Sequence, residues 1–306
     1  MDSLACTGYF AQPEHLTRVC KQLQSVEHVY GNLVVASGPV QRCDYAIEVM
    51  EDPLIISADS ISKAAQQLRS IQRNWWPYAP KYYRRSELLR QRLPYVSGKA
   101  LRFPCNPSRG NLGVYMYLQP DRLLAFQKTR RPFPLGEARF EEYDEESGPP
   151  SRAYLKLFEA LTLLGVYPDA GSKCLDLGAS PGSWTWVLAR LGARVIAIDR
   201  APLDPAMEAL EGVETRIGDA FQVTPERIGS VDWMFSDMIC YPEKLFAFVH
   251  NWHHSGLCQN FVCTLKFKTN ADYAIVDKCL EIEGSQVLHL YHNKHELTWM
   301  RISPTV

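Results

Sequence analysis

Short apolar segments alternate with amphipathic ones after residue 170, and this alternation most constrains the fold. Strands that are apolar along their whole length, with a helix between each pair, are typical of a mostly parallel sheet covered on both faces. The pattern therefore predicts an α/β, Rossmann-like domain. The predicted strands are 174–178, 194–199, 213–219, 231–237, 259–268, 287–292 and 296–302; the predicted helices are 183–192, 205–212, 243–256 and 271–284. The last two strands are expected to form a hairpin that supplies one antiparallel strand.

A domain boundary is predicted between residues 138 and 157. An acidic cluster (Glu141, Glu142, Asp144, Glu145 and Glu146) precedes Gly-Pro-Pro at 148–150, a sequence typical of a connector. Ser151 is then an N-cap candidate for a helix that ends near Gly165. We expect residues 151–306 to form the Rossmann-like domain. Residues 1–140 are expected to form a smaller α+β domain, with strands near 6–11, 32–38 and 45–50 and a Ser- or Asp-capped helix near 57–72.

Composition limits the class of protein. The 306 residues suffice for two domains, and a net charge of −1 gives no overall basic bias toward nucleic acid. Nine cysteines without a CxxC pair predict reduced thiols and no structural zinc. No metal is expected at His250, His253 and His254, which more often cap or face solvent at a helix end. The sequence shows no signal peptide and no apolar run of about 20 residues, so we expect a cytoplasmic protein.

A glycine-rich turn, LDLGASPGSWT, connects a predicted strand to a predicted helix at residues 175–185. Glycines there let a ligand approach the backbone at the edge of the sheet where α/β folds bind small molecules. The spacing differs from the GxGxxG fingerprint of NAD and FAD sites. The turn predicts a cofactor site that includes Gly178, Ser180, Pro181, Gly182, Ser183 and Trp184.

Aspartates end the strands that follow this turn. Asp199 lies 23 residues after Asp176 and is placed to accept hydrogen bonds from a ribose diol; Asp219 and Asp237 end the next two strands. An acid at each successive strand end suits a ligand with both an amine and a ribose, and S-adenosylmethionine (SAM) has both. The sequence therefore predicts SAM binding, with a nucleotide site or a vestigial site as the alternative.

Five segments resemble the FtsJ-type family of RNA ribose 2′-O-methyltransferases: PSRAYLKL, LDLGASPGSWT, VDWMFSDM, CTLKFK and LYHNKHELTWMRI. Within the family the chain is most similar to the RlmM branch, which modifies a cytidine of bacterial 23S ribosomal RNA. The resemblance implies a SAM-dependent methyltransferase domain, and it places the family's Lys–Asp–Lys–Glu tetrad on Lys156, Asp237, Lys266 and Glu296. Two features depart from the branch: Ser183 replaces a second glycine, and residues 1–140 are shorter than the expected THUMP-containing region.

The tetrad also makes chemical sense residue by residue. Methyl transfer to a ribose hydroxyl requires that the hydroxyl lose its proton and lie in line with the methyl carbon. A lysine can take the proton when desolvation or a nearby cation favours its neutral form. Lys266, inside an apolar strand, is predicted to be this base. Lys156 would supply the second cation, and Asp237 and Glu296 would orient the lysines. Taken singly, Lys156 could instead be a solvated helix lysine, and Glu296 a surface charge.

Residues 61–102 contain ten Lys or Arg and one acidic residue, Glu87. Aromatic residues lie among them (Trp75, Trp76, Tyr78, Tyr82 and Tyr83). Cations for phosphates and rings for bases are typical of RNA contact, so we expect RNA as the partner, either 23S rRNA or a pre-ribosomal particle. The alternative is a solvated basic helix with aromatic residues in the core.

The sequence thus predicts a SAM-dependent RNA ribose 2′-O-methyltransferase acting on a cytidine of 23S rRNA. Three alternatives remain: 2′-O-methylation of a different RNA, an RNA-binding protein that keeps the fold without activity, and a small-molecule methyltransferase.

Overall fold

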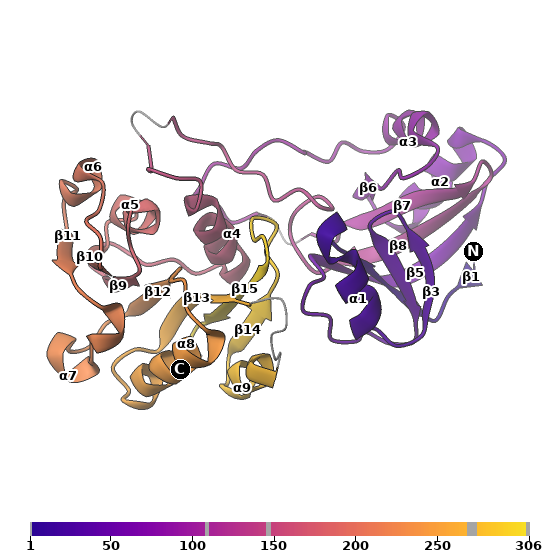
Figure 1. The fold of residues 1–306 in the computed structure, drawn as a ribbon. Helices are drawn as coiled ribbons and strands as arrows, with labels where there is room; N and C mark the ends of the chain where they lie inside the picture. The colour runs from indigo at the N-terminus through magenta and orange to yellow at the C-terminus, as the bar shows by residue number, and fades with distance from the viewer. Residues whose placement is uncertain (1, 108–109, 145–147, 268–273, 304–306) are drawn as a thin grey trace. The chain divides into compact units, whose positions relative to one another are not determined.

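The computed structural model describes residues 2–107, 110–144, 148–267 and 274–303 (Figure 1). The chain divides into two compact units. The first unit contains Met1–Leu101 and Asn106–Arg139, and the second contains Arg102–Cys105 and Phe140–Val306. The predictions that fall on Glu145, Glu146, Lys268 and 271–273 lie outside the described residues.

The second unit is built on a seven-stranded sheet in the order β11-β10-β9-β12-β13-β15-β14. Neighbouring strands are parallel except β15, which runs antiparallel to both of its neighbours. The predicted Rossmann-like fold is therefore confirmed, including the single antiparallel strand. The strands are β9 (Lys173–Leu177), β10 (Arg194–Asp199), β11 (Val213–Ile217), β12 (Trp233–Ser236), β13 (Asn260–Lys266), β14 (Ser285–Leu288) and β15 (Glu296–Arg301).

Helices cover both faces of this sheet. Helix α4 packs against α5, and α8 packs against α9; Figure 1 shows these two pairs on opposite sides of the sheet. Each face is therefore closed to water, which explains why the central strands β9 and β12 are almost entirely buried. The helices are α4 (Tyr154–Leu164), α5 (Ser183–Arg190), α6 (Pro205–Glu208), α7 (Pro225–Ile228), α8 (Pro242–His254) and α9 (Ala274–Glu281).

Two helix predictions need correction. Ser151 does not cap α4: the helix begins at Tyr154, Ala153 holds the cap position without a side-chain hydrogen bond, and Ser151 Oγ lies 2.7 Å from Ser183 Oγ. The hydroxyl thus contacts the cofactor turn, and it also accepts the N–H of Ala153 (3.4 Å), the residue at the cap position. The helix predicted over 205–212 is a single turn that ends at Glu208, although Asp204 caps it as a good N-cap residue should.

The first unit is an α+β fold, as predicted. Its sheet has the order β3-β4-β2-β5-β8-β7-β6, with β1 paired to β5, and only β6 and β7 pair in parallel. The strands are β1 (Asp2–Ser3), β2 (Cys6–Phe10), β3 (Val26–Tyr30), β4 (Leu33–Ser37), β5 (Glu48–Ser57), β6 (Trp75–Pro77), β7 (Gly113–Gln119) and β8 (Arg122–Thr129); the helices are α1 (Leu16–Gln22), α2 (Ile61–Ile71) and α3 (Tyr83–Arg90). Ser60 Oγ accepts the N–H of Lys63, so the predicted serine cap of α2 is confirmed.

Strand β6 sends its two tryptophans to opposite faces of the sheet. Trp75 packs in one hydrophobic cluster and Trp76 in the other, and both are buried. The Tyr78 hydroxyl forms two hydrogen bonds within the unit: it donates to Tyr30 O (2.8 Å) and accepts from Asn32 N (2.7 Å). For these three residues the expectation of RNA stacking is wrong, and the core interpretation holds. Tyr82 and Tyr83, by contrast, are exposed.

All nine cysteines lie among the described residues, and all are free thiols, as predicted. Within the part of the chain that the structure describes, no helix is both long and apolar enough to cross a membrane.

Candidate active site

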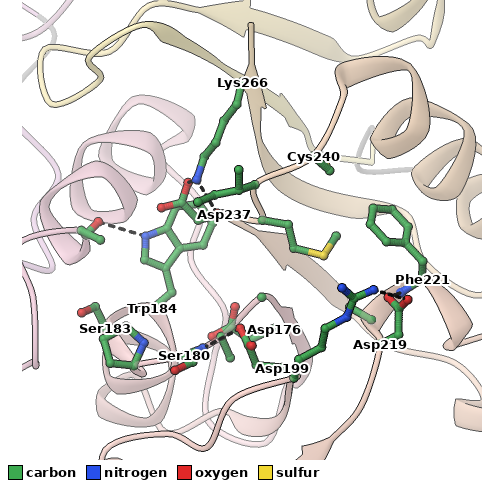
Figure 2. A pocket seen from close by; sticks show the side chains of 18 of the residues that line it. Asp176, Ser180, Ser183, Trp184, Asp199, Asp219, Phe221, Asp237, Cys240 and Lys266 are labelled. Atoms are coloured by element: carbon green, nitrogen blue, oxygen red, sulfur yellow. Dashed lines mark hydrogen bonds and ion pairs between the residues drawn. The ribbon is translucent and has the colours of Figure 1, made fainter. Parts of the chain in front are cut away.

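A cavity of about 940 Å³ opens at the carboxyl ends of the central strands of the second unit. All the predicted cofactor residues line it except Gly182. Figure 2 shows Lys266 and Asp237 above the cavity, Asp199 below it, and Asp219 with Phe221 to the right. Four carboxylates line the wall (Asp176, Asp199, Asp219 and Asp237). Three cations (Arg200, Lys244 and Lys266) line the same wall, so the cavity presents charges of both signs.

The backbone requires both glycines of the turn, because each has a positive φ and leaves no room for a Cβ. Gly178 has φ +72°, and a Cβ there would lie 2.4 Å from Met238 Cγ, so the turn and the segment after β12 can meet only at a glycine. Gly182 has φ +117°, and a Cβ there would lie 2.6 Å from Met207 Cγ. Its carbonyl accepts the N–H of Trp186 at the start of α5. Gly182 therefore shapes the turn, while Gly178 lines the cavity.

Asp199 is fixed by the backbone around it. Its Oδ2 accepts the N–H of Ser180 (3.1 Å), and its Oδ1 accepts the N–H of Ala201 (3.0 Å). Because a carboxylate can accept about four hydrogen bonds, each oxygen keeps acceptor capacity. The carboxylate lies at the end of β10 on the cavity wall, where the sequence analysis expects a ribose diol to bind.

Asp219 lies on the cavity wall, at the right-hand side in Figure 2. Its Oδ1 accepts the N–H of Phe221 (3.0 Å), and Arg200 pairs with its Oδ2 (2.5 Å). The Lys244 ammonium lies 3.7 Å from the centre of the Phe221 ring. Arg200, Phe221 and Lys244 were not predicted from sequence, and no spacing signal points to them.

Asp176 is the most buried carboxylate of the site. Its side chain is 1% exposed, and the Thr185 hydroxyl donates to its Oδ2 at 2.7 Å. Burial raises the pKa of Asp176 to about 7; the Thr185 hydrogen bond opposes this, and the charges of Asp237 and Asp199 add to it. Asp176 was not predicted as a cofactor residue, although it lies near the end of β9 as the other aspartates lie near the ends of their strands.

Ser183 and Trp184 join the cofactor turn to α4. Ser183 Oγ contacts Ser151 Oγ and donates to Ser151 O (3.1 Å), while Trp184 Nε1 donates to Ala153 O (2.9 Å). These contacts fix the beginning of the helix that carries Lys156. The serine at position 183 therefore has a structural function of its own.

The tetrad residues come from four elements and meet at one point. Lys156 Nζ, on α4, donates to Asp237 Oδ1 (3.1 Å), to Asp237 Oδ2 (3.0 Å) and to Glu296 Oε1 (3.1 Å). Asp237 directly follows β12, and Glu296 begins β15. Burial would lower the pKa of Lys156, but the two carboxylates outweigh it and hold that pKa above its ordinary value. Lys156 is thus a charged ammonium that holds the two carboxylates together, and its side chain is 11% exposed. We call Lys156, Asp237 and Glu296 the clamp.

Lys266 is bound differently. Its Nζ donates to the Asp237 main-chain carbonyl (2.6 Å) and pairs with Asp237 Oδ1 (3.0 Å). It lies opposite Glu296 in the β13–β15 register and lines the cavity, whereas Lys156 does not. Among the described residues these two contacts leave one valence of Nζ for a ligand. Burial would raise the pKa of Asp237, but both ammonium groups hold it below its usual range.

One buried acid outside the tetrad supports it. Glu159 lies one turn after Lys156 on α4 and is fully buried. Its carboxylate accepts the N–H groups of Tyr291 (2.9 Å) and His292 (3.1 Å), in the segment that leads to Glu296. Asn293 Nδ2 donates to Glu296 O (3.1 Å). Sequence reasoning missed Glu159, although a glutamate on the apolar face of a helix is a signal of a buried partner.

The residues present fit SAM. The glycine cradle at Gly178 gives access to the backbone, Asp199 offers acceptors to a diol, and buried or half-buried carboxylates face a space where a sulfonium and an ammonium would lie. Among the described residues, no group of three or more His, Cys, Asp or Glu is placed to hold a metal ion.

Comparison with known proteins agrees with this geometry. A family model described as FtsJ-like methyltransferase matches residues 149–296. The ribosomal RNA large subunit methyltransferase M of Azoarcus sp. (strain BH72) is 36% identical over 183 residues, which are 55% of this chain and 49% of that protein. The protein of the same name from Xylella fastidiosa (strain 9a5c) is 32% identical over 228 residues, 66% of this chain and 63% of that protein. The chain spans about half the length of the first of these curated relatives.

These matches confirm the predicted resemblance. Residues 149–296 form an FtsJ-like methyltransferase domain, and the predicted cofactor, SAM, is the one that such a domain uses.

Proposed function

We propose that this protein is an RNA ribose 2′-O-methyltransferase that uses SAM and acts on large-subunit ribosomal RNA, with a cytidine of 23S rRNA as the target. The observation that carries the proposal is the Lys156–Asp237–Glu296 clamp with Lys266 beside it at the cavity wall. The names of the curated relatives support the choice of RNA.

The proposed cofactor site comprises the cavity residues that the sequence predicts for it. Asp199 would accept the ribose hydroxyls, and Asp219 would mark the end occupied by the base of the cofactor. Gly178, Ser180, Pro181, Ser183 and Trp184 would form the cradle around it, with Gly182 shaping the turn. Bound SAM supplies an electrophilic methyl group on a sulfonium sulfur.

Lys266 would act as the general base. Lys266 would accept the proton that the 2′-hydroxyl loses, and SAM held in the cavity would supply the methyl group that replaces it. Lys156 stays protonated because two carboxylates hold it, so it supplies a fixed positive charge behind Asp237. Asp237 thereby contacts both lysines, and it holds Lys266 at the cavity wall. Glu296 orients Lys156, and alignment of hydroxyl and methyl contributes much of the rate.

The first unit would contact RNA through its exposed basic surface, defined by Lys81, Arg84, Arg92, Tyr82 and Tyr83. All five side chains are exposed. Long cations at this density favour phosphate contact, and the two tyrosines offer rings for bases. Residues 1–140 would form the RNA-contacting domain, which would be an incomplete or diverged THUMP-like domain. Residues 151–306 would form the catalytic domain.

The test is transfer of labelled methyl from SAM to protein-free total RNA from cells that lack this gene. Wild-type protein is compared with Lys266→Ala and with Lys278→Ala, an exposed lysine of α9 in the same unit that serves as the matched control. Label in alkali-resistant linkages identifies 2′-O-methylation, and the mapped position names the target. We expect label with wild type and Lys278→Ala, and none with Lys266→Ala.

Two results would count against the proposal. Equal labelling by Lys266→Ala would remove Lys266 as the base. No labelling of free RNA or of ribosomal precursor particles, in a preparation that binds SAM, would leave the alternative of an RNA-binding protein without activity.

A further inference from the structure

Two large apolar side chains are exposed immediately after Asp237. Ile239 is 93% exposed and Tyr241 is 60% exposed, and both line the same cavity as Asp237 and Lys266. Single exposed apolar residues are common on protein surfaces. Two of them within three positions, on the wall of the cavity that also holds Asp237 and Lys266, indicate a surface that binds an apolar partner.

The backbone presents these side chains from a fixed position. Tyr241 O accepts the N–H groups of Lys244 (3.1 Å) and Leu245 (3.2 Å), so it is part of the first turn of α8. At the other end of the segment, Ser236 Oγ accepts the N–H of Met238 (3.5 Å). Because both ends are held by regular elements, little conformational freedom would be lost when a ligand binds.

The distance between Asp237 and the segment 239–241 limits which part of a substrate can contact that segment. Consecutive Cα atoms are about 3.8 Å apart, so the Cα of Ile239 lies within about 7.6 Å of that of Asp237. A 2′-hydroxyl and its base are on adjacent carbons of one ribose. A hydroxyl held at Lys266 Nζ therefore brings its base close to the segment 239–241.

We infer that Ile239 and Tyr241 form a nucleobase-binding surface for the target nucleotide. This inference rests on the proposed function. The planar face of an unstacked base packs against the Ile239 side chain and the Tyr241 ring, while Lys266 holds the ribose hydroxyl. Because stacking depends on a π-face that every base has, this surface binds a base without selecting strongly among bases.

The first test measures base binding without any methylation. The full chain, with ¹³C-methyl-labelled isoleucine, is saturated with S-adenosylhomocysteine and titrated with cytidine 5′-monophosphate, uridine 5′-monophosphate and ribose 5-phosphate. Ile239→Val identifies the Ile239 methyl signal. We expect an upfield shift of that signal with both nucleotides and none with ribose 5-phosphate, because only a base has a ring current. The absence of a base-dependent shift overturns the inference, whatever the enzyme activity shows.

The second test uses methylation of total RNA. Tyr241→Ala should lower kcat/KM for RNA about tenfold, mainly through KM, because one stacking contact is lost. Tyr241→Phe should retain wild-type kcat/KM, and the affinity for S-adenosylhomocysteine should not change in either variant. Val166→Ala is the control: Val166 is 44% exposed, between α4 and β9, and does not line the cavity.

The two tests separate this inference from the proposed function. A base-dependent shift of Ile239 in a protein that methylates no RNA would support the surface and remove the proposed function. Methylation by wild type with an unchanged kcat/KM in Tyr241→Ala would overturn the part assigned to Tyr241.

Discussion

Asp176 couples cofactor binding to pH. Burial raises its pKa to about 7, whereas an unfolded aspartate has a pKa near 4. The folded protein therefore binds this proton more tightly than the unfolded chain does. The contribution of Asp176 to the free energy of unfolding is present below about pH 4 and is lost as the pH rises to about 7.

A cationic cofactor beside Asp176 should release this proton. A nearby positive charge favours the carboxylate, so SAM binding at pH 7 should release protons, and SAM affinity should fall by up to about tenfold per pH unit below pH 7. Titration calorimetry in buffers of different ionisation enthalpy measures the proton count. Asp176→Asn should bind SAM without proton release. A proton count near zero in wild type at pH 7 would show that the ligand charge does not reach Asp176.

Lys156 should contribute to stability as well as to catalysis. Lys156→Met would leave Asp237 and Glu296 close together with side chains only 19% and 14% exposed. We expect the free energy of unfolding to fall by about 3 kcal/mol, measured by urea denaturation, because breaking a buried ion pair leaves uncompensated charge. Adding Glu296→Gln should recover part of the loss.

The matched control for this variant is Arg152→Met, which breaks the exposed Arg152–Glu142 pair in the same unit. Its side chains are 71% and 55% exposed, so the expected loss is below about 1 kcal/mol. Equal losses in the two variants would contradict a special role for the clamp.

The residue types of the tetrad could be predicted from the sequence, but their contacts could not. The resemblance identifies two lysines and two acids without saying which lysine is fully paired. That distinction depends on Lys266 reaching the Asp237 carbonyl while Lys156 reaches both carboxylates. It follows from the packing of α4, β12, β13 and β15, which no local pattern encodes.

At the scale of elements, α4 connects the clamp to the segment 289–295. Lys156 and Glu159 lie on the same face of the helix: one holds Glu296 directly, and the other holds the backbone that leads to it. Glu159 is thus a positioning residue. It acts through Glu296 and does not line the cavity.

Glu159→Gln should separate positioning from binding. A glutamine keeps one acceptor oxygen, so one of the two backbone N–H groups loses its partner and the segment shifts. We expect kcat for RNA methylation to fall about tenfold, which corresponds to about 1.4 kcal/mol, with KM for SAM unchanged. A variant that loses only thermal stability, with wild-type kcat at a temperature where it is folded, would show that the role is purely structural.

Most strands of the second unit were predicted to within a few residues because they are short apolar runs separated by helices, although β11 is mostly polar and exposed. In the first unit, β1, β3, β6, β7 and β8 were missed. Strand β7 is buried at its first five positions, so it lacks the alternation that reveals a half-buried strand. Strand β3 has the opposite problem: it lies at the edge of the sheet beside β4 and is mostly exposed, and its sequence, VEHVY, does not alternate apolar with polar residues.

At the scale of the whole molecule, the division of the chain is less simple than a single connector suggests. Residues Arg102–Cys105 leave the first unit and join the second, where the Phe103 ring stacks on Phe158 with ring centres 3.8 Å apart. The sequence could not show this, because a single phenylalanine in an irregular segment has no periodic pattern. The chain then returns to the first unit at Asn106 and stays in it up to Arg139.

The proposed RNA surface of the first unit should add affinity without touching the chemistry. Lys81→Glu with Arg84→Glu should raise the Kd for protein-free large-subunit rRNA. It should also reduce the slope of log Kd against log salt by roughly 1–2, since each lost phosphate contact removes about 0.7–0.9. Calorimetric SAM affinity should stay at the wild-type value, because both substituted residues belong to the first unit and the SAM cavity is lined by residues of the second.

The control for charge alone is Lys21→Glu with Arg122→Glu, two exposed cations of the same unit outside this surface. Both double variants change the net charge by the same amount, so a general electrostatic effect would alter the salt slope equally in the two. A larger loss of slope in Lys81→Glu/Arg84→Glu would locate phosphate contacts at α3. Identical slopes would mean that RNA does not contact this face, and RNA binding would then have to come from the cavity rim of the methyltransferase domain.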